Sequence, residues 1–74
     1  MNEEVVKKYI EGNTTMQLSE ALGNDLFETY LVCEIDKVDE ELDNPNNDVE
    51  TYNCLQTRKR TLQEVREAYY NLKK

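Results

Sequence analysis

The stretch Glu41–Glu50, with the sequence ELDNPNNDVE, decides the fold because it separates two long segments of helical periodicity. Pro45 is the only proline in the chain. It cannot continue a helical hydrogen-bond ladder, and it disfavours helical geometry in Asn44 before it. Asn47 and Glu50 then have the spacing of a capping box at the start of a new helix. The stretch therefore predicts a turn between two helices.

Apolar residues on both sides of this turn recur at the three- and four-residue spacing of an amphipathic helix. They are Leu31, Ile35, Val38 and Leu42 before the turn, and Leu55, Leu62, Val65, Tyr69 and Leu72 after it. Two long helices joined by a short loop form an antiparallel hairpin. We therefore predict helices at about residues 25–43 and 48–72, packed along these apolar rows.

The register of the hairpin follows from placing the centre of symmetry in the middle of the turn. Leu42 then meets Val49 at the tip, and Phe27 meets Leu62 or Val65 near the open end. Apolar residues face apolar residues at all levels but one. This agreement supports the antiparallel pairing.

The exception is Arg58, which occupies the apolar row of the second long helix opposite Glu34. An arginine in such a position can pack its aliphatic stem and keep its guanidinium group in water. Alternatively, it can pair with one carboxylate and fix the register of the two helices. Both interpretations give Glu34 and Arg58 a structural role.

Two shorter helices are predicted before the hairpin. The first covers about residues 3–11 and the second about residues 15–22, and we expect Gly12 and Gly23 to end them in the left-handed conformation. The last turn of the second long helix extends past the start of the first, so we expect the two short helices to pack at this open end. The predicted fold is all-α, with one domain over residues 1–74.

The composition argues against catalysis, cofactors and metal binding. Histidine is absent, so a nucleophile has no imidazole base, and two glycines are too few for a phosphate-binding loop. Cys33 and Cys54 stand apart, with no CxxC pair, and supply too few ligands for zinc. We therefore predict that the chain is not an enzyme and has no catalytic, cofactor-binding or metal-binding residue.

The N-terminal residues also lack the layout of a signal peptide, and no apolar run approaches the roughly 18 residues of a membrane span. We expect no membrane partner. The predicted location is the cytoplasm, or the cytoplasm of the host cell if the protein is encoded by a phage. Unbridged thiols are expected in that compartment.

Charge is distributed unevenly within a total of −7. Residues 25–50 hold ten acidic side chains and one basic, a net of −9, whereas residues 51–74 hold six basic and two acidic, a net of +4. The basic helix cannot neutralise the acidic one, so a negative patch is expected around the turn. Its residues are Asp36, Asp39, Glu40, Glu41, Asp43, Asp48 and Glu50.

These features favour a protein–protein interaction module that binds a larger partner. The acidic patch suits a basic, nucleic-acid-binding surface of that partner, as in a phage-type inhibitor or regulator. The alternative is a small structural or assembly subunit, such as a virion or scaffold component, that self-associates through Val32, Tyr52 and Tyr70. In a third hypothesis, the acidic patch serves only solubility, and the protein binds its partner by its apolar surface.

The segment from Thr14 to Val32, TTMQLSEALGNDLFETYLV, also resembles a helix-turn-helix. That resemblance implies a DNA-binding regulator. However, the would-be recognition helix opens with Asp25 and Glu28 and has no basic residue before Lys37. Such charges oppose entry into a groove lined by phosphates, so direct nucleic-acid binding is not expected.

Overall fold

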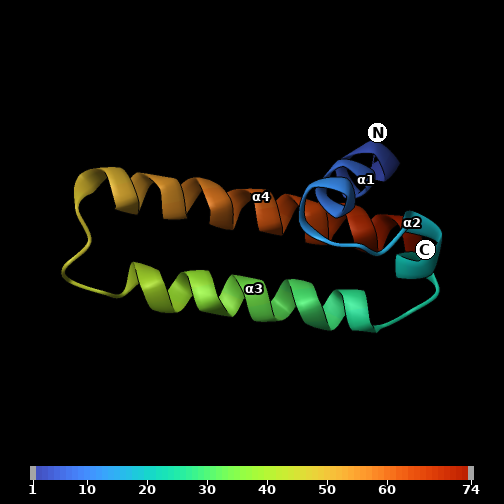
Figure 1. Ribbon diagram of the computed structural model, residues 1–74, viewed down its shortest axis with the longest axis horizontal. Coiled ribbons are helices and arrows are strands. Elements are labelled where there is room, and N and C mark those ends of the chain that lie inside the picture. Colours follow the sequence, from blue (N-terminus) through green and yellow to red (C-terminus); the bar gives the residue numbers. More distant parts are fainter. Residues whose placement is uncertain (1, 74) are drawn as a thin grey trace.

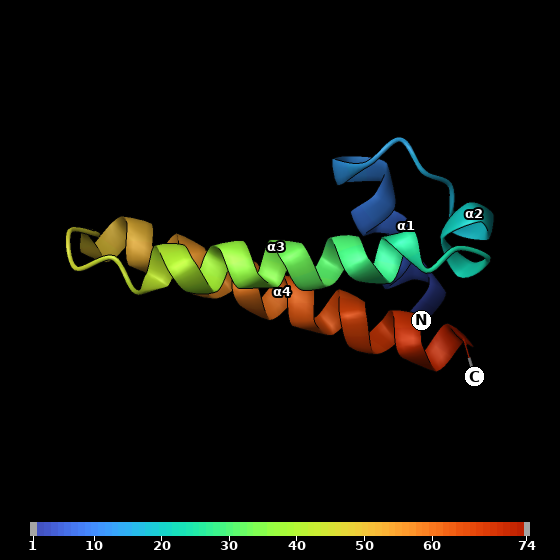
Figure 2. The same cartoon turned by 90° about the horizontal axis from the view of Figure 1, so that it is seen from below.

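The computed structural model describes residues 2–73, which fold into four helices without a strand (Figure 1). The helices are α1 (Asn2–Asn13), α2 (Leu18–Leu22), α3 (Leu26–Leu42) and α4 (Val49–Lys73). The two long helices α3 and α4 run antiparallel, and α1 and α2 lie at the open end of this hairpin (Figures 1 and 2). The predicted all-α hairpin with two N-terminal helices is confirmed.

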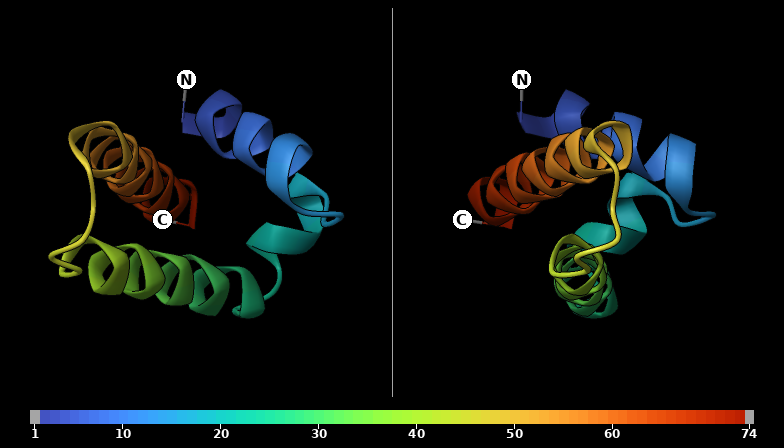
Figure 3. Two further views of the ribbon diagram at one scale, coloured as in Figure 1. Left: turned by 60° about the vertical axis from the view of Figure 1, so that its left-hand side comes forward. Right: turned by 90° about the vertical axis from the view of Figure 1, so that its left-hand side faces the viewer.

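Helix α4 is the central element, because both α1 and α3 pack against it, on different sides (Figure 3). Val6 and Ile10 of α1 are buried in the same hydrophobic core as Phe27 and Leu31 of α3. Because α1 and α3 pack on different sides of α4, this helix needs two apolar faces. The buried residues of that helix are Leu55, Leu62, Val65, Ala68 and Tyr69. The apolar row seen in the sequence therefore serves two helices rather than one.

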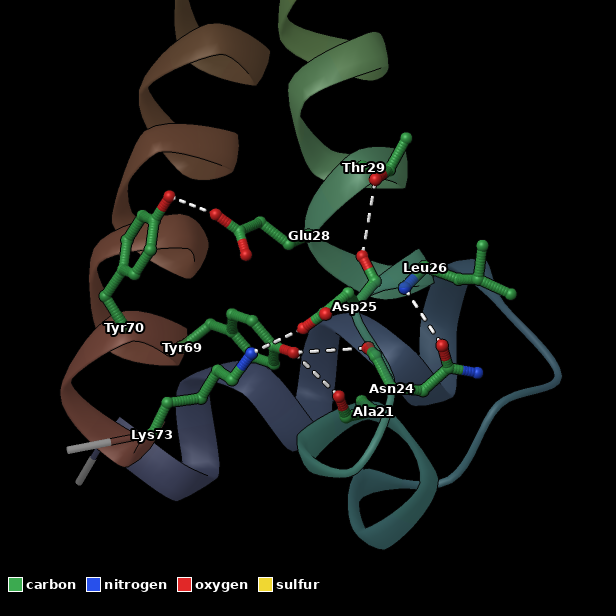
Figure 4. A network of polar contacts seen from close by, with 9 residues as sticks. All are labelled: Ala21, Asn24, Asp25, Leu26, Glu28, Thr29, Tyr69, Tyr70 and Lys73. Atoms are coloured by element: carbon green, nitrogen blue, oxygen red, sulfur yellow. Dashed lines mark hydrogen bonds and ion pairs between the residues drawn. The ribbon is translucent and has the colours of Figure 1, made fainter.

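The open end is held together around the fully buried ring of Tyr69. This ring packs edge-on against Phe27, with 5.0 Å between the centroids. The Tyr69 hydroxyl group donates a hydrogen bond of 2.7 Å to the carbonyl oxygen of Ala21 in α2, and it lies 3.4 Å from the carbonyl oxygen of Asn24 (Figure 4). One side chain thus joins α4 to α3 by packing and to α2 by a hydrogen bond.

The predicted register of the hairpin is wrong at the tip. Val49 was expected to pack against Leu42, but 78% of its surface is exposed. At the open end, Phe27 packs on Tyr69, which lies one helical turn beyond Val65. The first turn of α4 instead extends past the end of α3 (Figure 1). The apolar spacing repeats every turn, so it allows either register.

Hydrogen bonds within the loop mark where α3 ends and where α4 begins. The side-chain oxygen of Asn44 accepts a 3.0 Å hydrogen bond from the amide of Asn46, which forms a local turn. The side-chain amide of Asn47 donates to the carbonyl oxygen of Glu41 near the end of α3. Asn47 therefore closes the preceding helix instead of capping the next one. The cap of α4 is Asp48, whose carboxylate accepts a 2.7 Å hydrogen bond from the amide of Thr51.

Two predicted helix ends also differ from the structure. Helix α1 continues through Gly12 to Asn13, and Gly23 has a φ of −95°, so neither glycine adopts the left-handed conformation. Helix α2 begins at Leu18 rather than near residue 15. The hydroxyl oxygen of Thr14 accepts a hydrogen bond from the amide of Met16, and this turn competes with helix formation.

Candidate partner-binding surface

The seven predicted patch residues lie in the half of the hairpin that contains the turn, and α2 lies at the opposite end of the hairpin (Figure 1). We call this set the acidic tip: Asp36, Asp39, Glu40, Glu41, Asp43, Asp48 and Glu50. Five of them come from the second half of α3 and the residue after it, one from the cap position before α4 and one from the first turn of α4. Asp39 is half-buried and the other six are exposed.

Asp39 is neutralised by a cation from the opposite helix. The ammonium group of Lys59 lies 2.6 Å from its carboxylate, and this hydrogen bond, together with the charge of Asp39, raises the pKa of Lys59 above its ordinary value. The pair bridges α3 and α4 next to the tip. Asp39 is therefore both a patch residue and a structural residue.

Two further cations, Arg58 and Lys37, pair with Glu34, which lies outside the acidic tip. Arg58 Nη2 lies 3.0 Å from Glu34 Oε2, and Lys37 Nζ lies 3.5 Å from Glu34 Oε1. The side chain of Arg58 remains 59% exposed. The structure thus forms the Glu34–Arg58 pair that the sequence suggests. The guanidinium group of Arg58 binds the carboxylate of Glu34 and is also exposed to water.

Asp48 has a structural role of its own as the cap of α4. Hydrogen bonds from the backbone amide and the side chain of Thr51 lower the pKa of Asp48 below its ordinary value. These bonds favour the ionised form. Asp48 therefore keeps its negative charge at the tip while it satisfies the first turn of the helix.

The remaining five carboxylates form no ion pair within residues 2–73. They are Asp36, Glu40, Glu41, Asp43 and Glu50. All five are exposed to solvent. Their charges add to a negative potential that the nearby cations, bound to Asp39 and Glu34, do not cancel. The tip can therefore attract a cationic surface.

At the open end, other pairs continue the bridge between the two long helices. The ammonium group of Lys73 lies 2.9 Å from Asp25, which raises the pKa of the lysine, and the Tyr70 hydroxyl donates a hydrogen bond to Glu28 (Figure 4). These two pairs show the antiparallel register. Moving three residues forward from Asp25 to Glu28 corresponds to moving three residues back along α4, from Lys73 to Tyr70. The Asp39–Lys59 pair follows the same register, because Asp39 lies eleven residues after Glu28 and Lys59 lies eleven residues before Tyr70.

The predicted self-association patch consists of Val32, Tyr52 and Tyr70. Its two tyrosines lie on the same side of α4 as Lys59 and Lys73. Tyr52 and Tyr70 are exposed, and Val32 of α3 is half-buried. The hydroxyl group of Tyr52 accepts a hydrogen bond from Gln56, and the guanidinium group of Arg66 lies over the ring of Tyr70. These polar contacts interrupt the apolar surface between the two tyrosines.

Other chemistry is limited in the described part of the chain. Cys33 and Cys54 are exposed thiols without a bridge. No group of three Cys, Asp or Glu side chains in residues 2–73 is arranged to hold a metal ion. Nor does any helix of this range combine the length and hydropathy that a membrane crossing requires.

Comparison of the chain with protein-family models, with curated proteins and with solved structures finds no match.

Proposed function

We propose that this chain is a non-enzymatic protein–protein interaction module that presents its acidic tip to a basic surface of a larger protein. A nucleic-acid-binding surface is the kind of partner that fits, since its cations normally neutralise phosphates. A phage-type inhibitor or regulator that occupies such a surface would act in this way, in the host-cell cytoplasm. The protein would then compete with nucleic acid without binding it.

One observation carries this proposal: three cations that approach the tip, on α3 and α4, are already bound to carboxylates. Lys59 pairs with Asp39, and Arg58 and Lys37 pair with Glu34. Five exposed carboxylates of the tip have no ion-pair partner within residues 2–73. Complementary charge of this kind speeds the encounter with a basic partner and rejects acidic ones.

The experiment compares two variants that carry the same change of charge. The tip variant has Asp36→Lys, Glu40→Lys, Glu41→Lys and Asp43→Lys, and leaves Asp39 in place for Lys59. The control variant has Glu11→Lys, Glu20→Lys, Glu64→Lys and Glu67→Lys, which are exposed residues outside the tip. Circular dichroism verifies that both remain helical.

Each immobilised protein is then exposed to a lysate of the organism that encodes it. The proposal expects wild type and the control variant to retain one common partner that the tip variant does not retain. Duplex DNA or RNA should release that partner in competition. Equal retention by the tip variant, or a partner without affinity for nucleic acid or other polyanions, would contradict the proposal.

The exposed rings of Tyr52 and Tyr70 support a second candidate, a self-associating assembly subunit. In that case the protein should form a defined oligomer that Tyr52→Ser and Tyr70→Ser together dissociate. Sedimentation across a concentration series measures this directly. A strict monomer at all concentrations would exclude the assembly role.

A further inference from the structure

We infer that the tip carries an apolar anchor formed by Val49 and Tyr52, and that its partner presents a basic amphipathic helix. This inference rests on the proposed function and specifies it. The anchor lies on the first turn of α4, which extends past the end of α3 (Figure 1).

The exposure of the anchor is the first argument. Val49 is 78% exposed and Tyr52 is 45% exposed, the highest values among the large apolar side chains of α4. Leu42, the last residue of α3, is by contrast partly buried against the core. A small chain has little apolar surface to spare, so apolar side chains left in solvent beside each other mark a contact surface.

The surroundings of the anchor determine the charge of its partner. Val49 lies between Asp48 and Glu50 in the sequence. Tyr52 lies near Lys59, and the carboxylates of Asp39 and Asp43 also lie near that lysine. Any group that covers the anchor therefore comes close to several carboxylates. Nucleic acid and anionic membrane surfaces are repelled there, and so is the same tip of a second copy.

The combination of anchor and carboxylates determines the shape of the partner surface. A purely electrostatic contact leaves the anchor in water, whereas an apolar stripe flanked by cations satisfies both features. A helix presents such a stripe when apolar residues recur at three- and four-residue spacing between lysines and arginines. In interfaces of this kind, buried apolar groups supply most of the affinity and the charged rim supplies the encounter rate.

The test uses two synthetic helical peptides of equal length and charge. One has a leucine stripe between lysines, and the other has alanine in place of each leucine, which preserves the helix. Dissociation constants are measured at about 150 mM salt, where long-range attraction between charges is screened. Wild type should bind the leucine peptide about tenfold more tightly, the equivalent of burying about one apolar side chain.

The anchor variant Val49→Ser with Tyr52→Ser should bind both peptides equally. The matched control is Leu26→Ser, because Leu26 is 66% exposed but lies at the opposite end of α3. It should keep the preference of wild type for the leucine peptide. Equal binding of the two peptides by wild type, or an unchanged preference in the anchor variant, would overturn the inference.

The tip variant separates failure of the inference from failure of the proposed function. If reversing the four tip charges abolishes binding of both peptides while the anchor variant behaves as wild type, the charge proposal stands and the anchor is wrong. If the tip variant binds both peptides as tightly as wild type, the acidic tip itself has no role in binding and the proposed function fails.

Discussion

Tyr69 and Tyr70 are consecutive residues with different environments, so they allow a controlled test of the open end. Tyr69 is fully buried and its hydroxyl group donates to Ala21 in α2, whereas Tyr70 is exposed and donates to Glu28. A hydrogen bond that satisfies a buried carbonyl group contributes about 1 kcal/mol. An exposed one contributes much less, since water replaces it.

Tyr69→Phe should therefore lower the midpoint of thermal unfolding by about 4–8 °C, the shift expected for a loss of about 1 kcal/mol in a domain of this size. Tyr70→Phe serves as the matched control and should shift the midpoint by less than about 2 °C. Differential scanning calorimetry measures both. Equal shifts would show that Tyr69 does not hold α2 through its hydroxyl group.

Asp48 predicts a dependence of stability on acid. Its hydrogen bonds with Thr51 lower its pKa below the ordinary value of an aspartate in the folded chain. Asp48 thus contributes stability above about pH 4, and this contribution is lost as the pH falls through the lowered pKa. Asp48→Asn keeps an acceptor at the cap but cannot ionise.

The unfolding midpoint of wild type should exceed that of Asp48→Asn at pH 6, and the difference should shrink as the pH falls to about 3. Thermal unfolding followed by circular dichroism at several pH values provides the measurement. Glu50→Gln, two residues further, is the control for a general loss of charge. A difference independent of pH would contradict the assignment of Asp48 as an ionised cap.

At the scale of the elements, α1 is the part whose docking the sequence predicts least well. Val6 is fully buried in the core, while its neighbour Val5 is 40% exposed. Val6→Ala should lower the free energy of unfolding by about 2 kcal/mol because it removes packed methyl groups. Val5→Ala should change it by less than about 0.5 kcal/mol. Urea unfolding compares the two, and similar losses would argue against packing of α1 on α4 through Val6.

The ends of the long helices could be predicted to within about one residue, since the proline and the apolar period restrict them locally. The observed helices α3 (Leu26–Leu42) and α4 (Val49–Lys73) agree with the predicted spans 25–43 and 48–72. The register was predicted correctly where Glu34 faces Arg58, but not at the two ends of the hairpin. Apolar residues recur at every turn, and only the folded open end, where Phe27 meets Tyr69, selects one alignment.

The same limit applies to the candidate site. The seven acidic residues of the tip follow from the sequence, because their positions around the turn place them at one end of the hairpin. Which of them remain unpaired depends on the register. The pairing of Asp39 with Lys59, the capping role of Asp48 and the exposure of Val49 all arise from the way α4 extends past α3.

At the scale of the whole molecule, stability should be nearly constant from about pH 6 to 9, since the chain has no histidine. Burial raises the pKa of Tyr9, and ion pairs raise those of Lys59 and Lys73. Groups with raised pKa values contribute stability below their unfolded values and lose it as the pH rises through the folded values. Urea midpoints should therefore fall above about pH 10. A midpoint that rises there would contradict these contacts.

The central claim concerns the charge of the tip, and the affinity for the captured partner tests it most directly. Dissociation constants are measured for wild type, the tip variant and the control variant at several salt concentrations. We predict that the tip variant loses at least about 100-fold in affinity at low salt, that the control variant stays within about threefold, and that salt weakens binding of wild type. Equal affinities of the tip and control variants would contradict the claim.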